Sequence, residues 1–140
     1  MYELMFALNS HNNRVARIML EDVQDINERD YKGASYIHMA RSVPMIQLLL
    51  KKGADINLQD NDGHTALHYA RTDKICRFLI DCGIDLTLKD NKGWLGLDGF
   101  DAQTRHTLME HWRRREALRQ QELFSATFMG QQAAGKVRVL

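Results

Sequence analysis

Long hydrophobic runs are missing from this chain of 140 residues. A helix that crosses a bilayer needs about 20 mostly apolar residues, and the apolar stretches here are far shorter, so the sequence predicts no membrane-spanning helix. The first residues, Met1 to Phe6, are apolar but lead at once into the polar Asn9, Ser10 and His11. This order differs from the charged-then-apolar order of a secretory signal, and we expect no such signal.

Cysteine is scarce, with only Cys76 and Cys82 in the chain. Cys76 falls among the apolar residues of a predicted helix, where a thiol behaves as a small core side chain. We expect no disulfide between the two cysteines, and their presence as thiols favours an intracellular protein of the cytoplasm. A cysteine pair alone does not make a metal site, and the sequence predicts neither a metal nor a cofactor.

Neither positive nor negative charge predominates in the chain, since its formal net charge is +1. Residues 113–140 hold six Lys or Arg against two Glu, whereas the rest of the chain holds 13 against 16 acidic residues. Nucleic-acid binding needs a broader basic surface and an element that reads a groove. We therefore interpret Arg113–Arg115 and Arg119 as a solvated helix end and expect no nucleic-acid partner.

What the chain does have is a period of 30 residues. The residues that recur at this spacing are Gly33, Gly63 and Gly93; Asp30, Asp60 and Asp90; Gly53 and Gly83; His38 and His68; Ala40 and Ala70; and Arg41 and Arg71. A fixed period between about 20 and 50 residues is typical of stacked repeats. Such proteins bind partners through their surface and seldom catalyse reactions.

The repeated residues resemble the ankyrin repeat. Asp60–Ala70 is similar to the turn and first helix of that family, and Gly53–Asn57 is similar to its closing loop. The resemblance implies an all-α solenoid of helix-turn-helix units, with β-hairpin-like loops and a C-terminal helical cap. It also implies a protein-protein interaction module. The family period is about 33 residues, so the central units here are three residues shorter, and their first helices should be short.

The period divides the chain into four units that together form a predicted stack over residues 1–112. The units are residues 1–29, which lack the leading turn; residues 30–59 and 60–89, which follow the pattern best; and residues 90–112, which lose it after the turn. Residues 113–140 are expected to form a helical extension with a flexible tail.

The end of the chain is the part that the resemblance leaves unexplained. We expect a helix from Asp101 or Thr104 to about Phe124. Its residues Leu108, Met109 and Trp112 would cover the open end of the stack, because terminal repeats need a polar outer face. Gln131–Gly135 is predicted to be flexible. Val137–Leu140 is predicted to be a disordered end, or a strand added to a partner's sheet.

Several repeated residues have predicted structural roles. Gly33, Gly63 and Gly93 suit turns that need a positive φ. Hydroxyl and carboxylate side chains precede the predicted helices and suit N-caps: Ser35, Thr65, Ser42, and Thr72 or Asp73. His38 and His68 are expected to bond to backbone atoms within the stack, which is also the usual role of the family's histidine at this place.

The pattern predicts no enzyme. His64 and His68 are four residues apart but lack the glutamate of a zinc-protease motif. Gly93–Gly96 lacks the lysine and the preceding strand of a phosphate-binding loop. None of the candidate nucleophiles or paired carboxylates has the partners that a catalytic site needs.

Function is therefore expected from surface recognition. In ankyrin-like folds the tips of the turns and the exposed side of the first helices form a concave face. Carried over by position, the candidate partner-binding residues are Tyr31, Lys32, Tyr36, Met39, Arg41, Asn61, Asp62, His64, Tyr69, Arg71, Asn91, Lys92 and Trp94. This set is rich in the residue types enriched at interfaces. Trp94 is either an exposed anchor or packs near Phe100.

Three roles remain open at this point. The first is an adaptor that binds another folded protein through the concave face. The second is a dedicated inhibitor, of the immunity or counter-defence type, that blocks an enzyme's active site or assembly. The third is self-association through the C-terminal extension.

Overall fold

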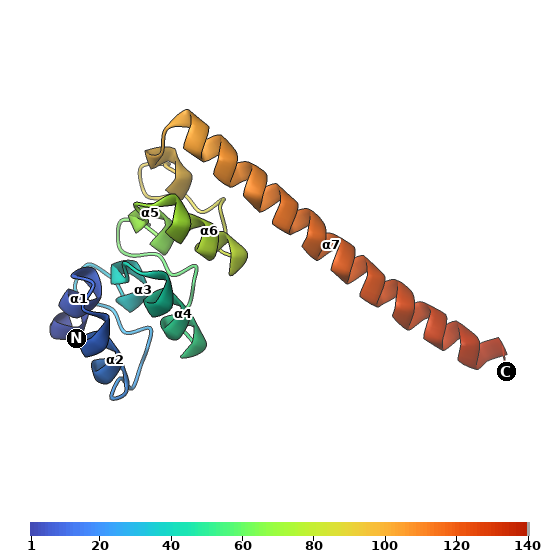
Figure 1. The fold of residues 1–140 in the computed structure, drawn as a ribbon, viewed down its shortest axis with the longest axis horizontal. Coiled ribbons are helices and arrows are strands. Elements are labelled where there is room, and N and C mark those ends of the chain that lie inside the picture. Colours follow the sequence, from blue (N-terminus) through green and yellow to red (C-terminus); the bar gives the residue numbers. More distant parts are fainter. Residues whose placement is uncertain (140) are drawn as a thin grey trace.

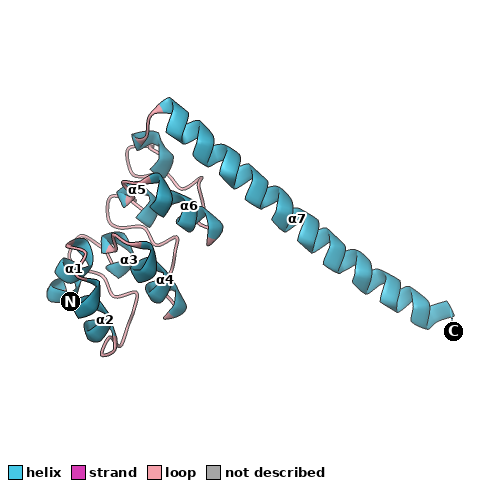
Figure 2. Ribbon diagram, in the orientation of Figure 1, coloured by secondary structure: helices cyan, strands magenta, loops and turns pink. Residues whose placement is uncertain are grey.

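The computed structural model describes the backbone of residues 1–139 and the side chains of residues 1–128. Over that range the chain is helical, with no strand and a single isolated β-bridge between Lys89 and Leu95 (Figures 1 and 2). The elements are α1 (Tyr2–Asn9), α2 (Asn13–Leu20), α3 (Tyr36–Met39), α4 (Val43–Lys51), α5 (Ala66–Tyr69), α6 (Asp73–Asp81), the 3-10 helix η1 (Gly96–Gly99) and α7 (Ala102–Val139). The all-α prediction is confirmed.

The helices stack in pairs. Along the row of first helices, α1 contacts α3, α3 contacts α5 and α5 contacts η1; in the row of second helices, α4 contacts α6 and α6 contacts α7. Figure 1 shows the pairs rising from α1 and α2 at one end to the start of α7 at the other. Side chains from every unit contribute to one core, among them the fully buried Leu8, Ile37, Leu49, Leu79 and Leu108. No single pair could bury its apolar side alone, so the core depends on stacking.

The two central first helices, α3 and α5, are only four residues long. Each ends at an alanine, Ala40 or Ala70, whose backbone is extended. Relative to the family period of about 33 residues, each central unit is therefore shorter by three residues at the end of its first helix, as the 30-residue period predicts. The second helices α4 and α6 keep nine residues each.

The predicted turn glycines are confirmed, and of the predicted N-cap side chains the hydroxyl of Thr72 accepts a cap hydrogen bond. Gly33, Gly63 and Gly93 have φ of +76°, +80° and +86°. Thr72 caps α6, because its hydroxyl accepts a bond from the Ile75 amide at 3.3 Å. Ser42 stands at the N-cap of α4 without capping it, since its hydroxyl faces Asn13 at 3.3 Å. Cys76 is a buried free thiol, and burial raises its pKa to about 12.

The last helix, α7, is longer than the sequence predicts. It starts after Asp101, whose carboxylate accepts from the Thr104 amide at 2.9 Å, and Leu108 is fully buried against the stack. The predicted end near Phe124 is wrong, because the helix runs to Val139. The stretch holds no proline, and a glycine inside a helix costs only about 1 kcal/mol, so Gly130 and Gly135 do not end it.

The predicted flexible segment and strand fall on the far end of this helix. The backbone of Gln131–Gly135 and of residues 137–139 is helical. The side chains beyond Phe128, and Leu140 altogether, lie outside the described residues. Among the described helices, none combines the length and the apolar composition that a membrane crossing requires.

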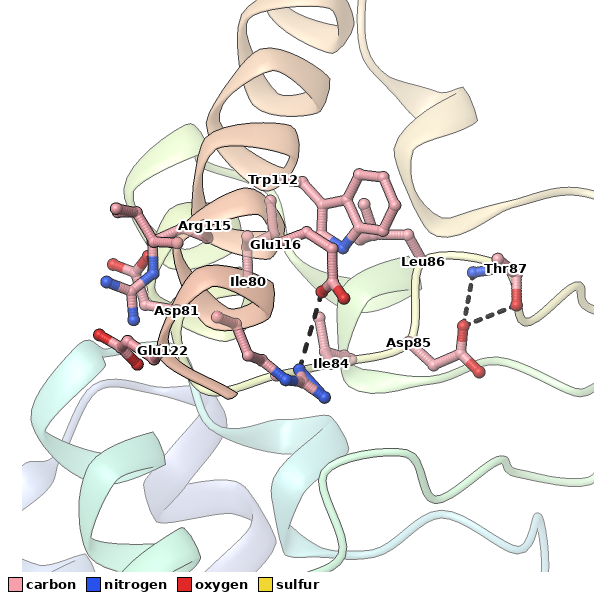
Figure 3. Close-up of a pocket in the computed structure, with 13 residues that line it drawn as sticks. Ile80, Asp81, Ile84, Asp85, Leu86, Thr87, Trp112, Arg115, Glu116 and Glu122 are labelled. Carbon is pink, nitrogen blue, oxygen red and sulfur yellow. Dashed lines mark hydrogen bonds and ion pairs between the residues drawn. The ribbon is translucent and has the colours of Figure 1, made fainter. Parts of the chain in front are cut away.

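A groove of about 490 Å³ opens where α7 leaves the stack (Figure 3). In the two preceding junctions one closing loop lies against the next, and the Asp55 and Asp85 amides donate to Asn27 and Asn57, both at 2.8 Å. Within the part of the chain that the structure describes, no fourth closing loop lies against residues 83–87, because the chain continues there as α7. Apolar side chains such as Ile84 form the floor of the groove, which the sequence did not predict.

Several charged side chains around this groove form ion pairs. Arg115 lies 3.3 Å from Asp81, which His111 also contacts at 2.7 Å, and Arg119 lies 3.8 Å from Glu116. These exposed pairs contribute little stability each, of the order of 0.2–1 kcal/mol. The two contacts to Asp81 join α7 to α6.

Candidate partner-binding face

The tips of the three turns are built in the same way. Asp30, Asp60 and Asp90 each accept hydrogen bonds from the amides two and four residues later, at 2.9–3.0 Å. The turn closes when the amide of the following glycine donates to the aspartate carbonyl, at 2.9–3.0 Å. An aspartate that bonds its own backbone in this way fixes a turn without help from other elements. The residues between the aspartate and the glycine are thus held outward.

Neighbouring tips are bonded to one another. The Asn61 amide donates to the Lys32 carbonyl and the Asn91 amide to the Asp62 carbonyl, both at 2.9 Å. The side-chain amides of the same asparagines donate to Tyr31 O at 3.2 Å and to Asn61 O at 2.8 Å. This ladder sets the spacing of the tips. The amide groups of Asn61 and Asn91 therefore bond neighbouring units to each other, although both residues are exposed.

Histidines join the first helices to the loops, as predicted. His38 Nδ1 accepts from the Ser35 amide at 2.9 Å, and its Nε2 donates to the Leu58 carbonyl at 2.9 Å. His68 repeats the pattern: its Nδ1 accepts from the Thr65 amide at 3.1 Å and its Nε2 donates to the Trp94 carbonyl at 2.9 Å. Burial lowers the pKa of His38, so this imidazole stays neutral in the fold.

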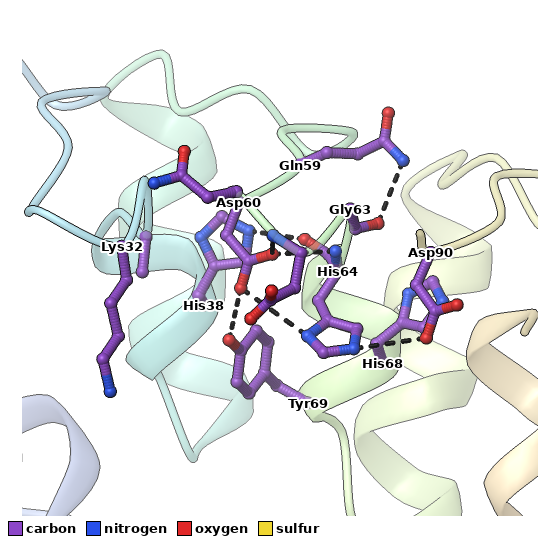
Figure 4. Close-up of polar contacts among 12 residues, drawn as sticks. Lys32, His38, Gln59, Asp60, Gly63, His64, His68, Tyr69 and Asp90 are labelled. Atoms are coloured by element: carbon purple, nitrogen blue, oxygen red, sulfur yellow. Dashed lines mark hydrogen bonds and ion pairs between the residues drawn. The ribbon is translucent and has the colours of Figure 1, made fainter. Parts of the chain in front are cut away.

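A polar network runs below the central tip (Figure 4). The Tyr69 hydroxyl donates to Asp60, and His64 lies between two carboxylates, 3.7 Å from Asp60 and 3.2 Å from Asp90. Burial raises the pKa of Asp60, but the bonds from Tyr69 and from the His64 and Asp62 amides outweigh it and leave the pKa below its ordinary value. Asp60 is thus ionised and anchors the network, while Tyr69 and His64 are only partly exposed.

Asp60, Asp62 and His64 also offer metal-ligand atoms that lie within 4.8 Å of one another. Both oxygens of Asp60, however, already accept hydrogen bonds, from the turn amides and from Tyr69. The Nε2 atom of His64 faces Asp90. The turn and the ladder account for this arrangement, and we assign it no ion.

The exposed predicted residues gather at the tips. Tyr31 is 75% exposed and Trp94 59%, and they stand on the second and fourth units. The other exposed members of the predicted set are Lys32, Asn61, Asp62, Arg71, Asn91 and Lys92. Equivalent tip positions therefore present Lys32, Asp62 and Lys92 in turn, an alternation of charge. We call the surface formed by Tyr31, Lys32, Asp62, Lys92 and Trp94 the tip face.

The other predicted residues lie deeper. Met39 and Arg41 are half-buried, and the Arg41 guanidinium is held by the Tyr69 carbonyl at 3.1 Å and the Asn9 side chain at 3.0 Å. The prediction that Tyr36 lies on the exposed side is wrong, because Tyr36 is only 1% exposed and its hydroxyl donates to Glu28. Position 36 faces the preceding unit.

The sequence did contain a signal of this burial. The residues equivalent to Tyr36 in the next units are Ala66 and Gly96, both small and both buried. A position that holds small residues in two of three units is a position of close packing between units.

A hollow of about 340 Å³ lies beside Trp94. Its lining includes His64, His68, Asp90 and Asp98. The Trp94 amide bonds to Asp90 at 2.9 Å and is the main cause that lowers the pKa of this carboxyl. The hollow thus places an ionised carboxylate beside an exposed indole. Sequence reasoning identified Trp94 but not the hollow, which forms only where the fourth unit departs from the pattern.

A family model described as ankyrin repeats, in three copies, matches residues 4–90. No curated protein matches the chain.

Proposed function

Because the chain belongs to the ankyrin repeat family, whose members generally act as protein-protein interaction modules, we propose that it binds a folded protein partner through the tip face. The observation that carries the proposal is the exposure of Tyr31 and Trp94 on turns that the ladder of hydrogen bonds holds in place. Large aromatic side chains on a rigid backbone lose little entropy when they bind, and they are enriched among binding hot spots.

The chemistry of the tip face favours a partner with a basic side chain near Trp94. A lysine or arginine over the hollow would meet the face of the indole and the negative charge of the nearby Asp90 carboxylate, and both attract a cation. The outer tips, with Lys32 and Lys92, would suit acidic groups on the same partner. The partner surface expected is therefore mixed in charge, with a cation at one end of the contact.

The experiment is a capture followed by an affinity measurement. The full chain is immobilised, the stoichiometric partner is identified, and its affinity is measured for the natural chain and for the Tyr31→Ala, Trp94→Ala double variant. Phe124→Ala is the matched control, because Phe124 is equally exposed but stands on α7. Loss of affinity in the double variant alone supports the proposal. An unchanged affinity in a folded double variant contradicts it.

The same face would serve an adaptor or an inhibitor, and the nature of the partner separates them. An inhibitor of the immunity or counter-defence type would bind one enzyme tightly and abolish its activity at equal concentrations. An adaptor would bind with modest affinity and leave activity intact. We place this binding in the cytoplasm, since both cysteines are free thiols, which a reducing compartment maintains.

A further inference from the structure

The end of the stack opposite α7 carries apolar side chains that the rest of the described chain leaves exposed. It is formed by the outward sides of α1 and α2, which lie at the edge of the molecule in Figure 1. Four large apolar side chains are exposed on these two helices, namely Tyr2, Phe6, Val15 and Ile18. We call this surface the leading face, because each later unit uses the equivalent surface to pack against the unit before it.

The repeat itself shows what these positions do elsewhere. Shifting by the 30-residue period, Phe6 corresponds to Tyr36 and Val15 to Met45, and both of these are buried in the second unit. Ile18 corresponds to Leu48, which is half-buried. The first unit thus has the side chains of an internal unit.

We propose that the leading face binds the leading face of a second copy of this chain, about a two-fold axis. Within the stack, a leading face packs on the far side of the preceding unit. In a second copy, the far side of the last unit is already covered by α7, whose Leu108 is buried and whose Met109 and Trp112 pack on the core. Head-to-tail stacking of two copies is therefore blocked, and the leading face itself remains as the complementary surface. A two-fold contact uses the same patch on both subunits.

The charges around the leading face fit this arrangement. The only charged side chain on α1 is Glu3, whereas α2 carries Arg14 and Arg17, and all three are exposed. A two-fold contact that lays α1 of one copy against α2 of the other brings the acidic helix to the basic one. The apolar side chains then form the centre of the interface and the charges its rim, as in known interfaces.

The extension α7 also exposes apolar side chains, but they do not form one surface. Leu118 and Phe124 are six residues apart, which at about 100° per residue places them about 120° apart around the helix. Leu123 is on a third side. A helix pair needs an apolar stripe that repeats about every 3.5 residues, and α7 lacks one over residues 113–128. The leading face is the better surface for a second copy.

The mass of the full chain in solution tests the proposal. Sedimentation or light scattering over about 1–100 μM should show a reversible shift from the 16.2 kDa monomer to twice that mass, in the range of weak dimers. Phe6→Glu should raise the dissociation constant at least about tenfold, because it buries a charge in the apolar centre. Phe6 is 74% exposed in the single chain, so this variant is expected to fold.

Further variants make the outcome decisive. Phe124→Glu, at a phenyl ring that is 71% exposed on α7, and Trp94→Ala, on the tip face, should leave the dimer unchanged. Glu3→Arg should weaken the dimer, and Arg14→Glu with Arg17→Glu in the same chain should restore part of it. A monomer throughout the concentration range overturns the proposal. So does a dimer that survives Phe6→Glu and is lost with Phe124→Glu, since it would then form through α7.

Discussion

At the scale of single residues, the fold depends on a few positions where backbone meets backbone. Gly33 is the clearest, because a Cβ atom there would lie 2.4 Å from the side-chain oxygen of Asn61 and 2.9 Å from its amide nitrogen. Gly53 has a similar positive φ, of +96°, but nothing lies within 4 Å of the place its Cβ would take. Substitutions at Gly33 and Gly53 therefore separate two free-energy costs, that of the backbone conformation and that of a steric clash between units.

We predict that Gly53→Ala costs about 1 kcal/mol of unfolding free energy, from its backbone conformation alone. Gly33→Ala should cost at least about 1 kcal/mol more, because the ladder between the second and third tips must shift. Urea unfolding of the two variants measures the difference. Equal costs would mean that the tips do not depend on this close approach.

His38 gives the stack a dependence on pH. Its pKa is lowered chiefly by burial, so the unfolded chain, with a value near 6.5, takes up the proton first as the pH falls. The stability that the neutral His38 contributes to the fold is fully present above pH 6.5. It is lost below that pH, by up to about 1.4 kcal/mol per pH unit, until the pKa of His38 in the folded chain is reached. Unfolding at about pH 7.5 and about pH 5.5 should show this loss in the natural chain and less of it in His38→Gln. Parallel curves for the two proteins would contradict it.

Trp94 is the residue on which recognition should depend most. We predict that Trp94→Ala weakens partner binding by about 2 kcal/mol, or roughly 30-fold in the dissociation constant. The stability of the chain should hardly change, because the indole is exposed and outside the core. Calorimetric titration gives the affinity and thermal melting gives the stability. A variant that melts early and binds normally would make Trp94 a structural residue.

At the scale of elements, stability depends on how far the side chains of each helix reach into the core. Leu79 of α6 is fully buried, whereas Leu123 of α7 is 57% exposed. We predict that Leu79→Ala costs about 2–5 kcal/mol and Leu123→Ala less than about 0.5 kcal/mol. Denaturant unfolding compares them. A small effect of Leu79→Ala would mean that the register of the repeats is wrong.

The same distribution leads us to propose residues 1–112 as the folded unit and the rest as an appendage. Apart from the half-buried Glu116, the side chains of residues 113–128 are exposed. A chain that stops after Gln121 should therefore keep its unfolding free energy within about 0.5 kcal/mol. Trp112→Ala, in contrast, should lower it by about 2 kcal/mol, because the indole packs on the core. A large loss on truncation would show that the end of α7 supports the stack.

The sequence predicts elements well where one residue has one role in every unit. The aspartate and glycine of each turn, Thr65 and His68 of the capping box, and the shortened first helices all follow from the 30-residue period. Prediction from the sequence fails where contacts between units determine the burial of a residue. The burial of Tyr36 depends on the unit before it, and the length of α7 depends on the absence of a breaker beyond Phe124. The groove of Figure 3 exists only because no fourth closing loop follows.

At the scale of the whole molecule, three surfaces have separate roles in this account. The tip face presents Tyr31 and Trp94 to a partner, the leading face presents Phe6 and Ile18 to a second copy, and the first part of α7 closes the stack. The first two lie on different parts of the molecule, so a dimer could engage two partners at once. Such bivalence raises the avidity for a partner that is itself paired, without any new contact.

The two tryptophans of the chain can report whether the partner binds the tip face. Trp94 is exposed on the tip face and Trp112 packs against the core. Nuclear magnetic resonance of the ¹⁵N-labelled indole groups, during titration with the captured partner, observes both in one spectrum. We predict that the Trp94 indole signal shifts to saturation while the Trp112 signal stays in place. A shift of Trp112 with an unmoved Trp94 would contradict the account and place the partner at α7.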